Sequence, residues 1–82
     1  MKRILIIKDS KAKIIVNNDY LVVKSIYEDK IVAFRYISAL YINKLADLSI
    51  SDVINLSKYF DVFFINQHGN ILASLKLEED IQ

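Results

Sequence analysis

The sequence predicts a small α+β domain that is mainly β: short antiparallel strands in a sandwich-like body, with one crossing helix at about residues 50–60. Three observations support this class. Several short apolar runs are dominated by β-branched and aromatic residues, as half-buried strands are. Turn-forming Asn, Asp and Ser separate the runs in a chain with one glycine and no proline. A helical period appears once, between Ile50 and Phe60.

Five strands are expected before the helix, at Arg3–Ile7, Lys13–Val16, Tyr20–Lys24, Ile31–Tyr36 and Ala39–Ile42. The second and third are joined by a turn at residues 17–19, Asn-Asn-Asp, which tolerates left-handed backbone geometry. In the fourth strand, strict alternation would place Val32, Phe34 and Tyr36 on one face.

The helix start is signalled by Ser49 and Asp52, which have the spacing of a capping box with Asp in place of the usual Glu. Leu48 and Val53 are placed to form a hydrophobic staple across this cap. The face expected to be buried comprises Ile50, Val53, Ile54, Ser57 and Phe60.

Two further strands, Val62–Ile65 and Ile71–Leu75, follow the helix and form a hairpin. Its loop carries Gly69, where a positive φ costs least. The core is expected to include apolar residues of every element: Ile4, Ile6, Val22, Val32, Phe34, Leu40, Ile42, Ile50, Val53, Ile54, Phe60, Val62, Phe64 and Leu72.

Composition narrows the classes of function. The 82 residues are expected to form one β-rich domain, 1–82. Their hydrophobic fraction of 54% indicates either an unusually dense core or apolar surface that needs a partner. The net charge of +1 argues against nucleic-acid binding by bulk charge, and the lack of cysteine excludes disulfides. No secretory signal or membrane span is recognisable, so a cytoplasmic protein without membrane contact is expected.

A cluster of lysines is the best candidate for a binding surface. Lys8, Lys11 and Lys13 surround one predicted turn, where they could contact a phosphate backbone weakly. The alternative is a solubility feature that protects a strand edge. The chain has five tyrosines, which are explained either by the strand propensity of tyrosine or by its enrichment at interfaces. Together with the apolar content they favour a homodimer.

No catalytic or metal site can be assembled from the sequence. His68 is the only histidine and is interpreted as a plain turn residue. Ser49 has no base beside it, so helix capping accounts for it. Glu78, Glu79 and Asp80 are either a solvated tail or ligands for a hard cation, and the first reading is preferred.

Most of the chain resembles a known family. The run Leu48-Ser49-Ile50-Ser51, the helix after it, the strand Asp61–Ile65 and the segment Gly69–Leu75 are similar to the N-terminal domain of the CRISPR adaptation integrase, the metal-dependent DNA endonuclease called Cas-one. Arg3–Ile7 looks like the family's first strand. The turn at 17–19 departs from the pattern, because it lacks the glycine often found there.

The resemblance implies a non-catalytic domain for dimerisation and positioning in a nuclease of spacer acquisition, part of antiviral defence. The parent protein would be a homodimer that works on DNA with a small ferredoxin-like partner and uses manganese or magnesium. The family's helical domain, with its metal-binding Glu, His and Asp, would begin where this sequence stops. No cofactor or catalytic residue is therefore assigned, and the chain itself is not expected to be an enzyme. One alternative is an unrelated small β-rich oligomerisation or adaptor module. Another is a nucleic-acid binder in its own right, which would use the turn with Lys8, Lys11 and Lys13.

The cap is directly testable. Ser49→Ala should lower the free energy of unfolding by about 0.5–2 kcal/mol, because a backbone N–H of the first turn loses its acceptor. A urea melt measures this, with Ser10→Ala as a control outside the helix. An unchanged midpoint in both variants would remove the cap assignment.

Overall fold

The computed structural model describes residues 1–76. They form seven strands, one α-helix and one 3₁₀ turn. In chain order these are β1 (Arg3–Ile7), β2 (Lys13–Val16), β3 (Tyr20–Lys24), β4 (Asp29–Ala33), η1 (Phe34–Tyr36), β5 (Ile37–Asn43), α1 (Ile50–Leu56), β6 (Asp61–Ile65) and β7 (Ile71–Leu75).

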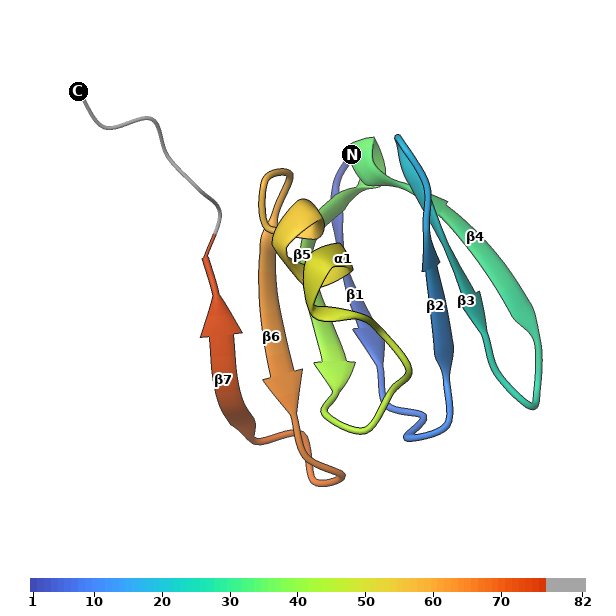
Figure 1. The fold of residues 1–82 in the computed structure, drawn as a ribbon, viewed down its shortest axis with the longest axis vertical. Coiled ribbons are helices and arrows are strands. Elements are labelled where there is room, and N and C mark those ends of the chain that lie inside the picture. Colours follow the sequence, from blue (N-terminus) through green and yellow to red (C-terminus); the bar gives the residue numbers. More distant parts are fainter. Residues whose placement is uncertain (77–82) are drawn as a thin grey trace.

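The strands form two sheets, and the predicted mainly β, α+β class with one helix is confirmed (Figure 1). One sheet has the order β1-β5-β6-β7 and the other β2-β3-β4. Antiparallel strands were predicted for most of the body, and three of the five strand pairs are antiparallel. The other two are parallel, because β5 pairs in parallel with both β1 and β6. Parallel neighbours need a crossover between them, and α1 supplies the one between β5 and β6.

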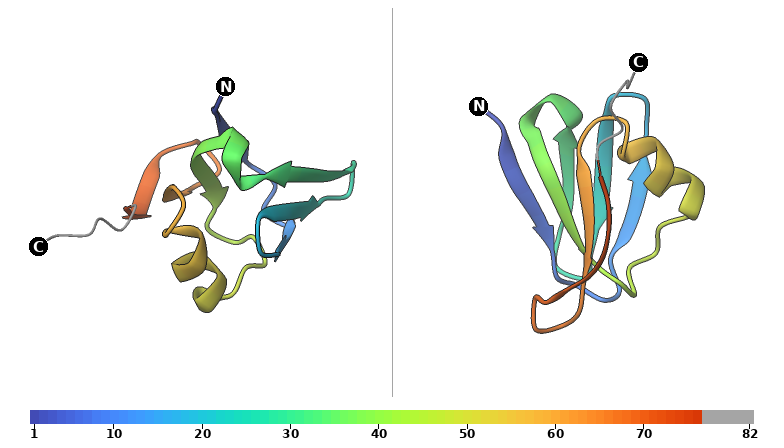
Figure 2. Two further views of the ribbon diagram at one scale, coloured as in Figure 1. Left: turned by 90° about the horizontal axis from the view of Figure 1, so that it is seen from above. Right: turned by 90° about the vertical axis from the view of Figure 1, so that its left-hand side faces the viewer.

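The core lies between the two sheets, which face each other across the molecule (Figure 2). The four-stranded sheet contributes Ile7, Leu40, Ile42 and Val62, all nearly or fully buried. The three-stranded sheet contributes Ile14, Leu21 and Val23. Together with Phe34, Leu56 and Phe60 these residues form one continuous apolar cluster.

The connection between β5 and α1 ties the two sheets together at one side. The backbone carbonyl of Asp47 accepts a hydrogen bond from the backbone N–H of Ile14 at 3.0 Å. The backbone N–H of Asp47 donates to the carbonyl of Ala12 at 2.8 Å. The helix then begins at its N-cap, where Ser49 Oγ accepts a hydrogen bond from the backbone N–H of Asp52 at 3.2 Å. The same segment therefore closes the sandwich and starts the helix.

The helix is shorter than the predicted range of 50–60, since it ends at Leu56. Ser57 Oγ donates a hydrogen bond back to the carbonyl of Ile54 at 2.7 Å, and Lys58 and Tyr59 make the three-residue backbone bonds of a turn. A serine that bonds its own backbone competes with helix propagation. The turn lets Phe60 reach the core while β6 starts at the next residue.

The fourth strand was also predicted in the wrong place. The strand predicted at 31–36 is β4 at Asp29–Ala33, followed by η1, where the chain leaves one sheet for the other. Phe34 is buried, and its backbone N–H donates to the carbonyl of Asp19 at 2.9 Å. Tyr36, predicted on the same face as Phe34, is instead about half exposed.

The predicted core was wrong where an element is apolar on both faces. In β1 the chosen face, Ile4 and Ile6, is more than half exposed, whereas Leu5 and Ile7 face the core. In β3 the core residues are Leu21 and Val23, not the predicted Val22. Leu72 of β7, also predicted in the core, is exposed. On α1 the buried residues are Val53 and Leu56, while Ile50 and Ile54 are exposed. An unbroken apolar run carries no period, so pattern alone cannot select its inner face.

The burial of α1 gives a matched pair of variants. Leu56→Ala should lower the free energy of unfolding by about 2–5 kcal/mol, because Leu56 is fully buried and its loss leaves a cavity. Ile54→Ala, at a position that is 50% exposed, should change it by about 0.5 kcal/mol or less. Chemical denaturation of both variants measures the difference, and a larger loss at Ile54 would contradict the observed helix face.

Candidate nucleic-acid interface and exposed sheet face

The turn that carries the predicted lysines is held by several hydrogen bonds. Asp9 Oδ1 accepts from the backbone N–H of Lys11 at 2.9 Å, and the Asp9 carbonyl accepts from Ala12 at 3.2 Å. The buried Asn43 donates from Nδ2 to the carbonyl of Lys8 at 3.1 Å. The turn therefore projects Lys8 and Lys11 into solvent from a fixed backbone.

The structure adds a fourth lysine to this cluster. In the pairing of β2 with β3, Lys13 lies directly opposite Lys24. Both point away from the core, since their neighbours Ile14 and Val23 point into it. Like charges directly opposite each other destabilise a sheet, so this pair favours a bound anion. Sequence reasoning missed Lys24 because only the strand register brings it beside Lys13.

Carboxylates near the cluster limit its positive potential. Lys24 lies opposite Asp29 on its other side, and Asp47 bridges to Lys13 through the backbone. Asp9 also belongs to the turn, and its Oδ2 is buried with no hydrogen-bond partner among residues 1–76. The lysines lie close together, yet the local charge is nearly balanced, which suits weak contact with phosphates rather than tight binding.

The other residues considered from sequence do not come together. His68 is exposed in the β6–β7 turn, where its backbone N–H donates to Asn66 Oδ1 at 2.9 Å. Gly69 in the same turn has φ +85°, the left-handed geometry that favours glycine. Within residues 1–76 no three His, Asp or Glu side chains gather as metal ligands, and no helix is long and apolar enough to cross a membrane. Glu78, Glu79 and Asp80 lie outside the described residues.

The outer face of the four-stranded sheet is apolar and open. Register places Ile6, Tyr41 and Phe63 side by side on this face, with Ile4 and Ala39 in the neighbouring row. Ile4 is 57% and Ile6 54% exposed. The rings of Tyr41 and Phe63 stack with their centroids 4.6 Å apart. We call this surface, Ile4, Ile6, Tyr41 and Phe63, the outer sheet face.

Solved structures with the same architecture identify the fold. A partial Cas6-RT-Cas1–Cas2 complex contains a chain that matches with a TM-score of 0.76 at 15% sequence identity, over 93% of this chain. A CAS1 protein from Thermotoga maritima matches with a TM-score of 0.75 at 13% identity, over 99% of this chain. The chain has the fold found in Cas1 proteins. The resemblance stated from sequence is thereby confirmed at the level of the fold.

A casposase bound to an integration product shares this fold as well, with a TM-score of 0.68 at 20% identity over 96% of the chain. The present chain spans only about a quarter of each of these three proteins: 24%, 25% and 26% of their lengths. No protein-family model and no curated protein matches the sequence. The likeness to Cas1 therefore lies in the arrangement of strands rather than in shared residues.

The lysine cluster predicts how binding to duplex DNA should depend on salt concentration. Three phosphate contacts, by Lys8, Lys11 and Lys13, should release enough counterions for a log–log salt slope of about −3. Lys13→Gln should reduce that slope by about 1, whereas Arg3→Gln, at the opposite end of β1, should leave it unchanged. Fluorescence anisotropy over a salt series measures both, and tight or salt-insensitive binding would contradict the assignment.

Proposed function

We propose that this chain is a non-catalytic N-terminal domain of a CRISPR-associated, metal-dependent DNA integrase, in which it forms the homodimer and positions the catalytic domain. The observation that carries the proposal is the outer sheet face, which is apolar and exposed in a fold shared with Cas1 proteins. By this reading the parent protein acts in spacer acquisition, with a small ferredoxin-like partner and a manganese or magnesium ion held by the catalytic domain.

A second copy of the chain is the natural occupant of the outer sheet face. Two-fold pairing of a surface with itself is the commonest way for a soluble protein to cover an apolar patch. The centre of this face holds stacked aromatic rings rather than charges. Lys76 Nζ lies 4.5 Å from the centroid of the Phe63 ring and marks the rim. An aromatic centre with a charged rim is typical of protein interfaces.

The alternative is an unrelated β-rich oligomerisation or adaptor module. Both functions use the outer sheet face, but only the first requires catalytic chemistry elsewhere in the same protein. A following helical domain with Glu, His and Asp at metal-ligand positions would favour the integrase. Weak DNA contact at Lys8, Lys11 and Lys13 would assist it, while an adaptor would have no use for that contact.

Self-association tests the proposal. The chain should sediment as a dimer at micromolar concentration, with a buried area on the order of 1,200 Å² or more. Ile6→Lys should give a folded monomer, because it places a charge at the centre of the outer sheet face. Ile31→Lys is the matched control, since Ile31 is also exposed but lies on the three-stranded sheet. Circular dichroism confirms that both variants fold.

Two results would contradict this arrangement. A strictly monomeric mass up to about 100 μM would exclude any dimer with a dissociation constant near 10 μM. Dissociation by Ile31→Lys but not by Ile6→Lys would move the interface to the other sheet.

A further inference from the structure

Two surface hollows meet at a pair of aromatic rings far from the lysine cluster. Phe34 and Tyr59 line both of them. Their ring centroids are 4.8 Å apart with a 41° tilt, and Phe34 in turn packs edge-on against Phe60 at 5.8 Å. Tyr59 is 51% exposed, so a half-exposed ring is held in place by a buried one. This arrangement is a preorganised stacking surface.

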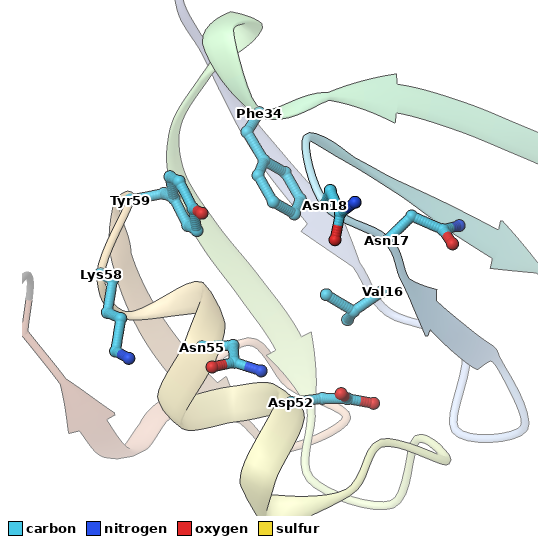
Figure 3. A pocket seen from close by; sticks show the side chains of 8 residues that line it. All are labelled: Val16, Asn17, Asn18, Phe34, Asp52, Asn55, Lys58 and Tyr59. Carbon is cyan, nitrogen blue, oxygen red and sulfur yellow. The ribbon is translucent and has the colours of Figure 1, made fainter.

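The first hollow, of about 350 Å³, lies between α1 and the β2–β3 turn. Figure 3 shows Asn55 reaching into it from the helix, with Asn18 across from it, while the amide of the third lining asparagine, Asn17, is turned away. Within residues 1–76 these three side-chain amides have no hydrogen-bond partner. Each offers an acceptor and two donors, the groups that read the edge of a nucleobase. Lys58 adds a positive charge beside them.

The second hollow, of about 500 Å³, lies on the other side of the ring pair. Lys2 and Arg35 line it together with Tyr20. The Arg35 guanidinium is fixed 4.9 Å above the ring of Tyr36, and its Nη2 donates to the Tyr36 hydroxyl at 3.3 Å. A cation held on an aromatic ring is a ready partner for a phosphate.

The charges around the hollows are mixed. Lys2, Arg35 and Lys58 are offset by Asp19 and Asp52, so attraction to an anion is moderate. Stacking and amide hydrogen bonds must then supply most of the recognition. A ligand that stacks, presents a polar edge and also carries spaced negative charges is a polynucleotide with unpaired bases. A duplex does not fit, because its bases are already stacked and paired.

We propose that the two hollows form a binding site for a single-stranded polynucleotide. One base stacks on Tyr59 with its edge toward Asn18 and Asn55, and the flanking phosphates approach Lys58 and Arg35. The site is separate from the lysine cluster, since Lys2 and Lys8 flank opposite ends of β1, a strand about 17 Å long (Figure 1). It is also independent of the proposed dimerisation, which uses the outer sheet face.

Titrations of the isotope-labelled 82-residue chain, followed by amide NMR shifts, test the site. The probes are eight-nucleotide oligo(dT) and oligo(U), with an abasic deoxyribose-phosphate oligomer of equal length as the control for charge alone. Shifts should appear at residues 17–18, 35, 55 and 58–59. Removing the bases should weaken binding at least about fivefold, the low end of the effect of one base–aromatic stack. Binding of either oligonucleotide supports the site, and a difference between their affinities reports the 2′-hydroxyl together with the thymine methyl group.

Two matched variants separate stacking from folding. Tyr59→Leu keeps an apolar contact for Phe34 but removes the ring, and it should weaken oligonucleotide binding at least about fivefold. Tyr27→Leu, at an 85% exposed tyrosine between β3 and β4, should have no effect. Asn55→Ala removes an exposed side-chain amide and keeps the backbone carbonyl that accepts from Lys58, so it tests the site even where Tyr59→Leu loses stability.

The proposal fails on any of three results. The first is a set of shifts confined to Lys8, Lys11 and Lys13. The second is an abasic oligomer that binds as tightly as oligo(dT). The third is unchanged affinity in both Tyr59→Leu and Asn55→Ala.

Discussion

The parallel pairing of the central strand β5 with both of its neighbours organises the whole fold. Ile37, Leu40 and Ile42 of this strand are essentially fully buried, and β5 pairs in parallel on both sides. Each parallel neighbour must be reached by a crossover. On one side the crossover is α1; on the other it is the whole three-stranded sheet, which folds back over the core between β1 and β5. The two-sheet architecture thus follows from the two connections that are needed to place β1 and β6 on either side of β5.

That arrangement leaves one face of the four-stranded sheet uncovered. The second sheet and α1 pack on the inner face, and no described element packs on the other. Apolar side chains on the uncovered face lose the stabilisation of about 25 cal/mol per Å² that burial would give them. The row Ile6, Tyr41 and Phe63 is therefore informative, because Ile6 is exposed and the two rings are only partly buried, and an apolar row of this kind is typical of an interaction surface.

The two ends of the sandwich carry different chemistry for a topological reason. At one end the β1–β2 turn and the paired Lys13 and Lys24 gather ammonium groups. At the other, η1 carries the chain between sheets and needs a large apolar anchor, Phe34. The turn after α1 brings Tyr59 onto that anchor. Four lysines thus lie near one end, and an aromatic pair with mixed charges around it lies at the other.

Features that depend on near neighbours along the chain are predictable from the amino-acid order. The strands β1, β2, β3 and β7, the helix start at Ser49 and the positive φ of Gly69 follow from signals within a few residues. The buried face of β1, the end of α1 and the placement of Lys24 beside Lys13 became known only from the folded chain. These outcomes depend on partners far along the chain. An apolar run such as Arg3–Ile7 gains similar energy from burying either face, until pairing with β5 selects one.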